Sequence, residues 1–330
     1  MSSAKHAVTE DQIFAIEHIQ PFQIALASVS MLCSGSVIYI LIQYYNDLVR
    51  GKPFIHFLLI MAISDTMSSL ALSFGFPKDN VLCSIQGFLY IFFERLSWFW
   101  LDALVIMLYY FAIYHKVLLS LKQVHYIIWP LSIVLQILPF LTKNGYGSPV
   151  DDLIDDDVQI GVCVYSVYHG SLNSYYLWTI MAFTVELLVS FLLVLGLTIR
   201  ILCFGRTPNN GNVMTLLPVV STVRETLILY PLAQLITTIP AIIYDIYHVF
   251  YFQTHNNFPK HYVSRQDLLV AITPLNSILF TIIFYAKTGE ALTKWKEIYG
   301  ICKYKLFMVF IKNYNNDDND NIYRDSSIEV

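Results

Sequence analysis

Long runs of apolar residues alternate with short polar segments along this chain of 330 residues. A helix needs about 20 mostly apolar residues to cross the hydrocarbon core of a membrane, and seven runs have close to that length or more. They cover residues 22–44, 54–76, 83–114, 124–141, 175–199, 227–249 and 268–286. The pattern predicts an all-α membrane protein, a seven-transmembrane helix bundle, and leaves little room for a separate soluble domain.

The ends of the chain have a different pattern. We expect residues 1–21 to form an N-terminal tail before a membrane domain of residues 22–286. Over 287–312, apolar residues recur at helical spacing among lysines, which predicts an amphipathic helix lying on the membrane surface. Residues 313–330 are rich in Asn and Asp and are expected to be a disordered tail.

Charge distribution predicts the orientation. Only 13% of the residues are charged, about half the share typical of soluble domains. Fourteen of the 20 Lys and Arg residues fall on one side of the predicted bundle and five on the other, while Arg95 falls within the third run. Cytoplasmic loops are enriched in Lys and Arg. We therefore expect an integral protein of the plasma membrane, with its N-terminus outside and its C-terminus in the cytosol.

Two cysteines fall on the predicted outer side. Cys83 opens the third run and Cys163 lies in the loop after the fourth, so both should face an oxidising compartment. A disulfide between them would tie the third helix to a long loop and reduce the conformational freedom of that loop. Two free thiols are the alternative.

Polar residues inside the apolar runs are candidates for function, because ionisable groups are costly at membrane depth. Asp65, Asp102 and Asn276 lie roughly 15–18 Å from the cytosolic ends of their helices at about 1.5 Å per residue. We expect them to converge in one polar cluster that holds a proton, a cation or water and acts as a switch. The alternative is a static set of hydrogen bonds between helices.

A second polar group lies nearer the outside and is the candidate ligand pocket. Its members are Glu94, Arg95, Trp98, Glu186 and Asp245. A buried guanidinium needs an anionic partner. That partner is either Glu94 or Glu186, in an internal ion pair, or the ligand itself.

Three prolines fall within the last two runs. Pro231 and Pro240 lie in the sixth and Pro274 in the seventh. Proline removes a backbone hydrogen bond and permits a kink, so these positions are candidate hinges. Static bends are the alternative, because proline is frequent in membrane helices.

Enzyme chemistry is not indicated. The nine histidines are scattered among loops, tails and helix ends, and neither a Ser-His-Asp pattern nor a phosphate-binding loop is present. We expect no catalytic residues, metal, cofactor or nucleic-acid partner. A proton- or cation-coupled transporter of small solutes is an alternative, because intramembrane carboxylates also line proton pathways.

Several short motifs occur in the order found in a known family. They are Ile63-Ser64-Asp65, Cys83-Ser84-Ile85-Gln86-Gly87-Phe88, Trp98-Phe99-Trp100, Leu229-Tyr230-Pro231-Leu232, and Pro274-Leu275-Asn276 with Tyr285. With them, the whole bundle resembles the cyclic-AMP-receptor-like G-protein-coupled receptors of slime moulds and other non-animal eukaryotes, to which sugar-sensing receptors of fungi are related.

The resemblance implies a receptor that senses an extracellular small-molecule or peptide ligand and signals to a heterotrimeric G protein. The expected coupling residues are His115, Lys116, Arg200, Arg206 and Arg224. The resemblance does not identify cyclic AMP as the ligand. The third run ends in Tyr114-His115-Lys116, which departs from the Asp-Arg-Tyr of rhodopsin-like receptors, and the seventh run lacks the lysine of a retinal-binding protein.

Overall fold

A computed structural model describes most of the helical part of the chain. The described residues are 15–48, 53–75, 80–114, 118–141, 145–147, 164–166, 186–204, 228–255, 268–289, 291–298 and 300. The chain divides into two units, Met1–Ile283 and Phe284–Val330. Each unit is described by itself.

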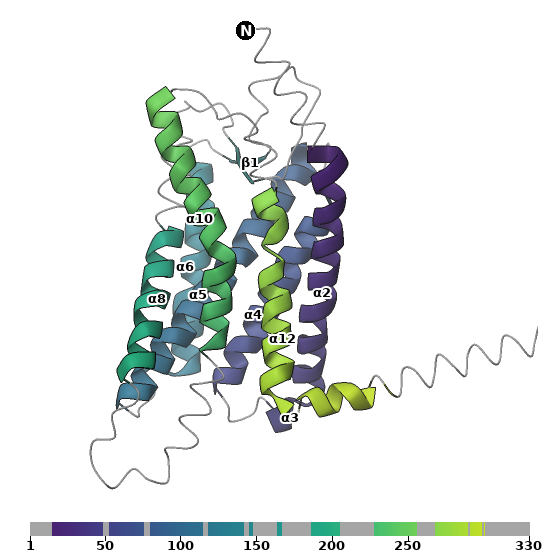
Figure 1. Cartoon of the computed structure of the whole chain (residues 1–330), viewed down its shortest axis with the longest axis vertical. Helices are drawn as coiled ribbons and strands as arrows, with labels where there is room; N and C mark the ends of the chain where they lie inside the picture. Colours follow the sequence, from purple (N-terminus) through teal and green to yellow (C-terminus); the bar gives the residue numbers. More distant parts are fainter. Residues whose placement is uncertain are drawn as a thin grey trace, which may run out of the picture. The chain divides into compact units, whose positions relative to one another are not determined.

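Figure 1 shows long helices running alongside one another in the first unit. Its elements are η1 (Ala15–Ile19), α2 (Gln20–Gln43), α3 (Tyr45–Leu48), α4 (Pro53–Ser73), α5 (Asn80–Tyr114), α6 (Leu121–Leu141), β1 (Gly145–Gly147), β2 (Val164–Ser166), α8 (Glu186–Phe204), α10 (Leu229–His255) and most of α12 (Leu275–Lys287). Lipid offers no hydrogen bonds, and a helix satisfies its backbone groups internally. The apolar runs therefore fold as helices.

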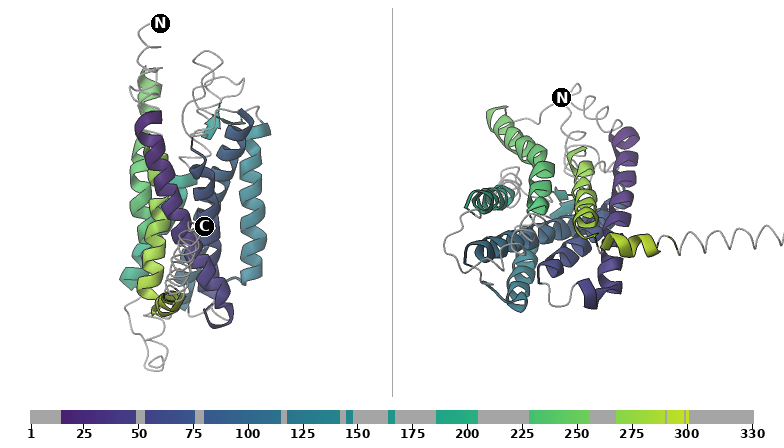
Figure 2. Two further views of the ribbon diagram at one scale, coloured as in Figure 1. Left: turned by 90° about the vertical axis from the view of Figure 1, so that its right-hand side faces the viewer. Right: turned by 60° about the horizontal axis from the view of Figure 1, so that its bottom comes forward.

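The helix α5 lies at the centre of this bundle. It packs against α4, α6, α8 and α10, and the antiparallel pair of β1 and β2 packs against it (Figure 2). Trp100 and Tyr90 of α5 and Phe57 of α4 are among the largest fully buried side chains. Apolar side chains such as Leu32 and Tyr126 are 71% and 79% exposed. A helical bundle with apolar residues both inside and outside is expected in a membrane.

The helices confirm most of the predicted segments and move several of their ends. Glu17–Gln43, Phe54–Ser73 and Leu268–Lys287 are long and apolar enough to cross a membrane. The first helical segment begins at Ala15 instead of residue 22, and the helix predicted to end at 249 continues to His255. Hydropathy does not mark these ends, because the helices extend into polar sequence.

The prolines are placed differently from one another. Pro231 is the third residue of α10, where a backbone N–H has no helical acceptor, so the prediction that it interrupts the helix is wrong. Pro240 lies inside α10. Pro274 lies in a turn with Thr273 that separates helical residues 268–272 from α12. The helix is interrupted only at Pro274, whereas α10 continues through Pro240.

Small polar side chains join α2 to α4. The hydroxyl groups of Ser30 and Ser69 are 2.7 Å apart, and Thr66 Oγ1 donates to Ser34 Oγ over 2.7 Å. Hydroxyl pairs of this kind allow helix backbones to approach closely and contribute about 1 kcal/mol in membranes. This polar seam fixes the register of the two helices.

Gly75, which follows the end of α4, has a φ of +70°. Its carbonyl oxygen accepts a hydrogen bond from Gln86 Nε2 of α5 at 2.7 Å. An added methyl group would lie 2.6 Å from Gln20 Nε2 and 3.1 Å from Ile24 Cδ1. Only glycine adopts this conformation without strain.

Gly75→Ala is expected to lower the stability of the bundle by about 1–3 kcal/mol. Thermal unfolding in detergent measures the change. Gly35→Ala is the matched control, because nothing lies within 4 Å of its added methyl group and alanine favours the helix. Equal unfolding temperatures for the two variants would contradict the role of Gly75.

In the second unit, residues 291–298 are helical. Lys294 Nζ lies 3.8 Å from Glu297 Oε2, and the rings of Tyr285 and Trp295 are 5.8 Å apart. These residues lie within the segment 287–312 that was predicted as an amphipathic helix. Residues 301–330 lie outside the described part, so the surface position of the segment and the disordered tail stay predictions.

Candidate functional site

A hydrogen-bonded group of three polar side chains joins α10 to α12. Asn276 Nδ2 donates to Gln234 Oε1, and Thr237 Oγ1 lies 3.4 Å from Asn276 Oδ1. Gln234 and Asn276 are both buried. Asn276 follows the turn at Pro274 by two residues, so this group lies beside the break in the helix. We call Gln234, Thr237 and Asn276 the amide cluster.

Asp102 of α5 is bound by a neighbouring helix. Ser190 Oγ of α8 lies 2.7 Å from Asp102 Oδ1 and 2.8 Å from Oδ2. Ser190 is 6% exposed. A hydrogen bond to a carboxylate is stronger than a neutral one, so Asp102 holds α8 against α5.

Asp65 of α4 is buried and faces α5, where its neighbours are Ser97 and Glu94. Asp65, Asp102 and Asn276 were expected to form one cluster. The hydrogen bonds and neighbours described for them instead fall on three helix pairs, α4 with α5, α5 with α8, and α10 with α12. Whether the three side chains also meet in one cluster stays a prediction.

The predicted ligand-pocket residues are described in part. Trp98 and Arg95 are buried, and Glu94 is partly buried. The polar neighbours of Glu94 include Tyr90, which hydrogen-bonds to it, Arg95 and Asp65. Tyr90 Oη also lies 3.4 Å from Thr273 Oγ1, so this region of α5 reaches the segment before α12.

Two further residues of the proposed pocket are placed by their backbones alone. Glu186 is the first residue of α8, and Asp245 lies within α10. Their side chains lie outside the described part of the structure. The geometry therefore does not choose between Glu94, Glu186 and a ligand as the main partner of Arg95.

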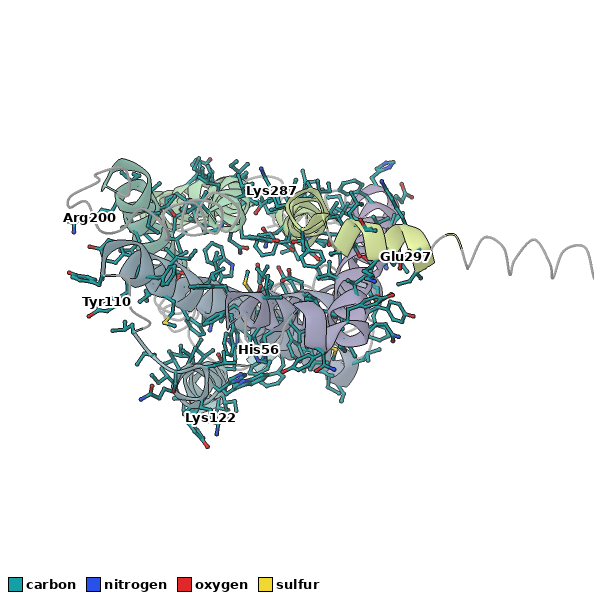
Figure 3. The ribbon with its side chains drawn as sticks, turned by 90° about the horizontal axis from the view of Figure 1, so that it is seen from below. His56, Tyr110, Lys122, Arg200, Lys287 and Glu297 are labelled. Carbon is teal, nitrogen blue, oxygen red and sulfur yellow. The ribbon has the colours of Figure 1, made fainter. Side chains whose placement is uncertain are left out.

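The coupling residues are also described in part. Arg200 is exposed on α8, and its Nη1 lies 3.4 Å from Tyr109 Oη of α5. Figure 3 shows Arg200 and Tyr110 at the end of the bundle that the charge distribution assigns to the cytosol. The other predicted coupling residues, His115, Lys116, Arg206 and Arg224, lie outside the described residues, as does Cys163.

A pair of histidines at this same end was missed by the sequence analysis. His56 Nε2 of α4 lies 3.4 Å from His125 Nε2 of α6. Trp129 Nε1 donates to His125 Nδ1 over 3.1 Å, and the ring of Trp100 lies 4.7 Å from that of His125. The expectation that the histidines are scattered is wrong for these two. The available signal was their position, one turn into α4 and one turn into α6, two alternate helices that begin at the same end of the bundle.

Metal ligands do not gather in the part of the chain that the structure describes. No group of three or more His, Cys, Asp or Glu side chains is placed there to hold a metal ion.

The helices and their apolar surfaces define an integral membrane protein with a rhodopsin-like, seven-transmembrane-helix fold. The structure is similar to the crystal structure of squid rhodopsin, with a TM-score of 0.61 and 16% sequence identity. The match covers 88% of this chain and 87% of the rhodopsin chain. At this identity the similarity is one of fold. No family model and no curated protein matches the sequence.

Proposed function

We propose that this chain is a seven-helix receptor that senses an extracellular ligand and signals to a heterotrimeric G protein. The observation that carries the proposal is the fold, which matches that of squid rhodopsin over most of both chains. The motifs that resemble cyclic-AMP-receptor-like receptors support the same function. The N-terminus faces outward and the C-terminus inward, as the excess of Lys and Arg on one side indicates.

The ligand binds in the outer half of the bundle. Arg95 and Glu94 of α5 are the charged candidates there, with Trp98, Glu186 and Asp245 around them. Arg95 is buried, so an anionic group of a ligand would have a preformed cationic partner. The ligand is a small molecule or a peptide whose anionic group pairs with Arg95.

A disulfide between Cys83 and Cys163 covers this outer end. Cys83 is fully buried and takes part in a disulfide. The residue after Cys163, Val164, begins β2, which packs against the helix that carries Cys83. These facts support the pairing.

The switch is the amide cluster, with Pro240 inside α10 and the helix break at Pro274 as its hinges. A ligand can shift a conformational equilibrium only by binding one state more tightly than the other. Hydrogen bonds between α10 and α12 are suited to this purpose, because they can be exchanged when α10 moves. The G protein contacts the basic residues near Arg200 on the opposite face.

A reporter of G-protein dissociation in cells tests this function. Cyclic nucleotides, sugars, amino acids and amines are screened on cells that express the full chain. We expect at least one compound to give a dose-dependent signal, reduced more than tenfold in Arg95→Ala, with equal surface expression. Val81→Ala is the matched control on the same helix, because Val81 is 68% exposed.

The transporter hypothesis predicts a different result. It requires uptake of a labelled solute that is lost in Asp65→Asn, without any dissociation of the G protein. That combination would overturn the receptor proposal.

A further inference from the structure

The three side chains of His56, His125 and Trp129, which we call the histidine latch, link α4 to α6. The helix α6 packs against α5, and the latch connects it to α4 as well. All three residues lie near the starts of their helices. Figure 3 views this end of the bundle, with His56 on α4 and Lys122 on α6 labelled.

The bond from Trp129 fixes the protonation state of the latch. An indole N–H only donates, so His125 Nδ1 must be unprotonated to accept it at 3.1 Å. A neutral His125 then carries its proton on Nε2. Because that nitrogen faces His56 Nε2 at 3.4 Å, His56 must accept and carry its own proton on Nδ1. The complete latch therefore requires both rings to be neutral.

Uptake of one proton breaks one bond of the latch in every arrangement. If His125 binds the proton, its Nδ1–H opposes the Trp129 N–H, while its Nε2–H still donates to His56. If His56 binds the proton at Nε2, that nitrogen can only donate to His125. His125 can then accept only by carrying its own proton on Nδ1, and Trp129 again loses its acceptor. If His125 keeps its proton, the two Nε2–H groups oppose each other.

The protonated state has a partner of its own. The ring of Trp100 lies 4.7 Å from the ring of His125, within the range of a cation–π interaction. A charged His125 would gain a cation–π attraction to Trp100 when it loses the hydrogen bond from Trp129. The site therefore has two alternative arrangements that differ by one proton.

The same geometry does not suit a metal. A neutral histidine that binds a metal through Nε2 carries a proton on Nδ1 and donates it to an acceptor. Trp129 offers a donor at that position. A zinc or copper ion would need the Trp129 bond to break first.

The other charged groups on the described parts of the helices around the latch are few. The electrostatic neighbour of His56 is His125. Lys122, one turn before His125, is exposed to solvent, and Asp102 is bound by Ser190. The remaining charged side chains in the described parts of α4, α5 and α6 are Asp65, Glu94 and Arg95. In sequence, Asp65 lies nine residues beyond His56 on α4, about 13 Å along the axis.

We propose that His56, His125 and Trp129 form a proton-sensitive latch, in which one proton breaks one of the two hydrogen bonds and a second proton, which leaves an N–H group on both facing nitrogens, frees α6 from α4. Because the hydrogen bonds of the latch require neutral rings, they oppose protonation, and we expect the change towards the acidic end of the range in which histidine titrates, between about 5 and 8. This inference stands whether or not the chain is a receptor.

Nitrogen NMR of the full chain in lipid nanodiscs tests the latch. The protein is labelled with ¹⁵N in Trp and His, and Trp129→Phe assigns the indole signal. At pH 8 we expect His125 to carry its proton on Nε2 and His56 on Nδ1. Between pH 8 and 5 the Trp129 signal should shift in one step, while that of Trp98 stays in place.

His125→Gln is the matched variant, because the glutamine oxygen accepts from Trp129 at any pH. Its Trp129 signal should not move with pH. A proton on Nδ1 of His125 at pH 8 would overturn the latch, and this measurement needs no variant. A Trp129 signal that is constant in the wild type, or that shifts equally in His125→Gln, would also overturn it.

Discussion

Cys83→Ser, Cys163→Ser and the double variant are expected to lose the same amount of stability, about 2–5 kcal/mol each. If the two cysteines are paired, the first substitution already removes the cross-link, so the second adds little. The bond would close a loop of about 80 residues, and a cross-link removes more conformational entropy from the unfolded chain when the loop is longer, so its loss should cost much stability. Thermal unfolding of the purified protein in detergent measures the loss.

Cys33→Ala is the control for this series, because Cys33 is a free cysteine within α2. It should change the unfolding temperature much less than the other variants. A reducing agent should lower the stability of the wild type to that of Cys83→Ser and leave the variants unchanged. Additive losses in the double variant would exclude a bridge between Cys83 and Cys163.

The fold was predictable from the sequence because hydropathy alone dictates where helices can cross a membrane. The apolar runs located α2, α4, α5 and α6 to within a few residues. The effect of a proline was less predictable, because it depends on where the helix begins. Pro231 reads as an interruption in the sequence but lies in the first turn of α10.

The depth of a polar residue in the membrane does not predict which side chain it contacts. Asp102 and Asn276 do lie inside the bundle, yet their hydrogen bonds reach Ser190 and Gln234, which the sequence analysis did not select. A partner depends on how each helix is rotated about its axis. Serine and glutamine within apolar runs are common, so their presence gave no signal.

The histidine latch could not be recognised from hydropathy for a related reason. His56 and His125 fall near the ends of different apolar runs, and the histidines therefore looked scattered. They lie on α4 and α6, which are separated by α5 and begin at the same end of the bundle, so their first turns can lie close together. Pairing residues by their distance from that end, instead of by their loop, would have joined them.

In the amide cluster, Gln234→Met and Asn276→Leu are each expected to lower stability by about 1–3 kcal/mol, and the double variant to regain most of that loss. Each single substitution leaves one buried amide without its partner, which has the full cost of an unsatisfied polar group. The double variant replaces both by apolar groups of similar shape, which is close to neutral. Thermal unfolding of the wild type, the two single variants and the double variant gives the coupling free energy between Gln234 and Asn276.

The G-protein response of the same variants tests whether the amide cluster is a switch or a static contact. If the amide cluster is the switch, the G-protein response should fall more than tenfold in the single variants and in the double variant, because apolar packing cannot exchange directional partners when α10 moves. Ser30→Ala with Ser69→Ala is the matched control, since it removes a buried polar pair from α2 and α4. It should alter stability and leave the response intact. A double variant that regains both stability and signalling would show that Gln234 and Asn276 only hold the helices together.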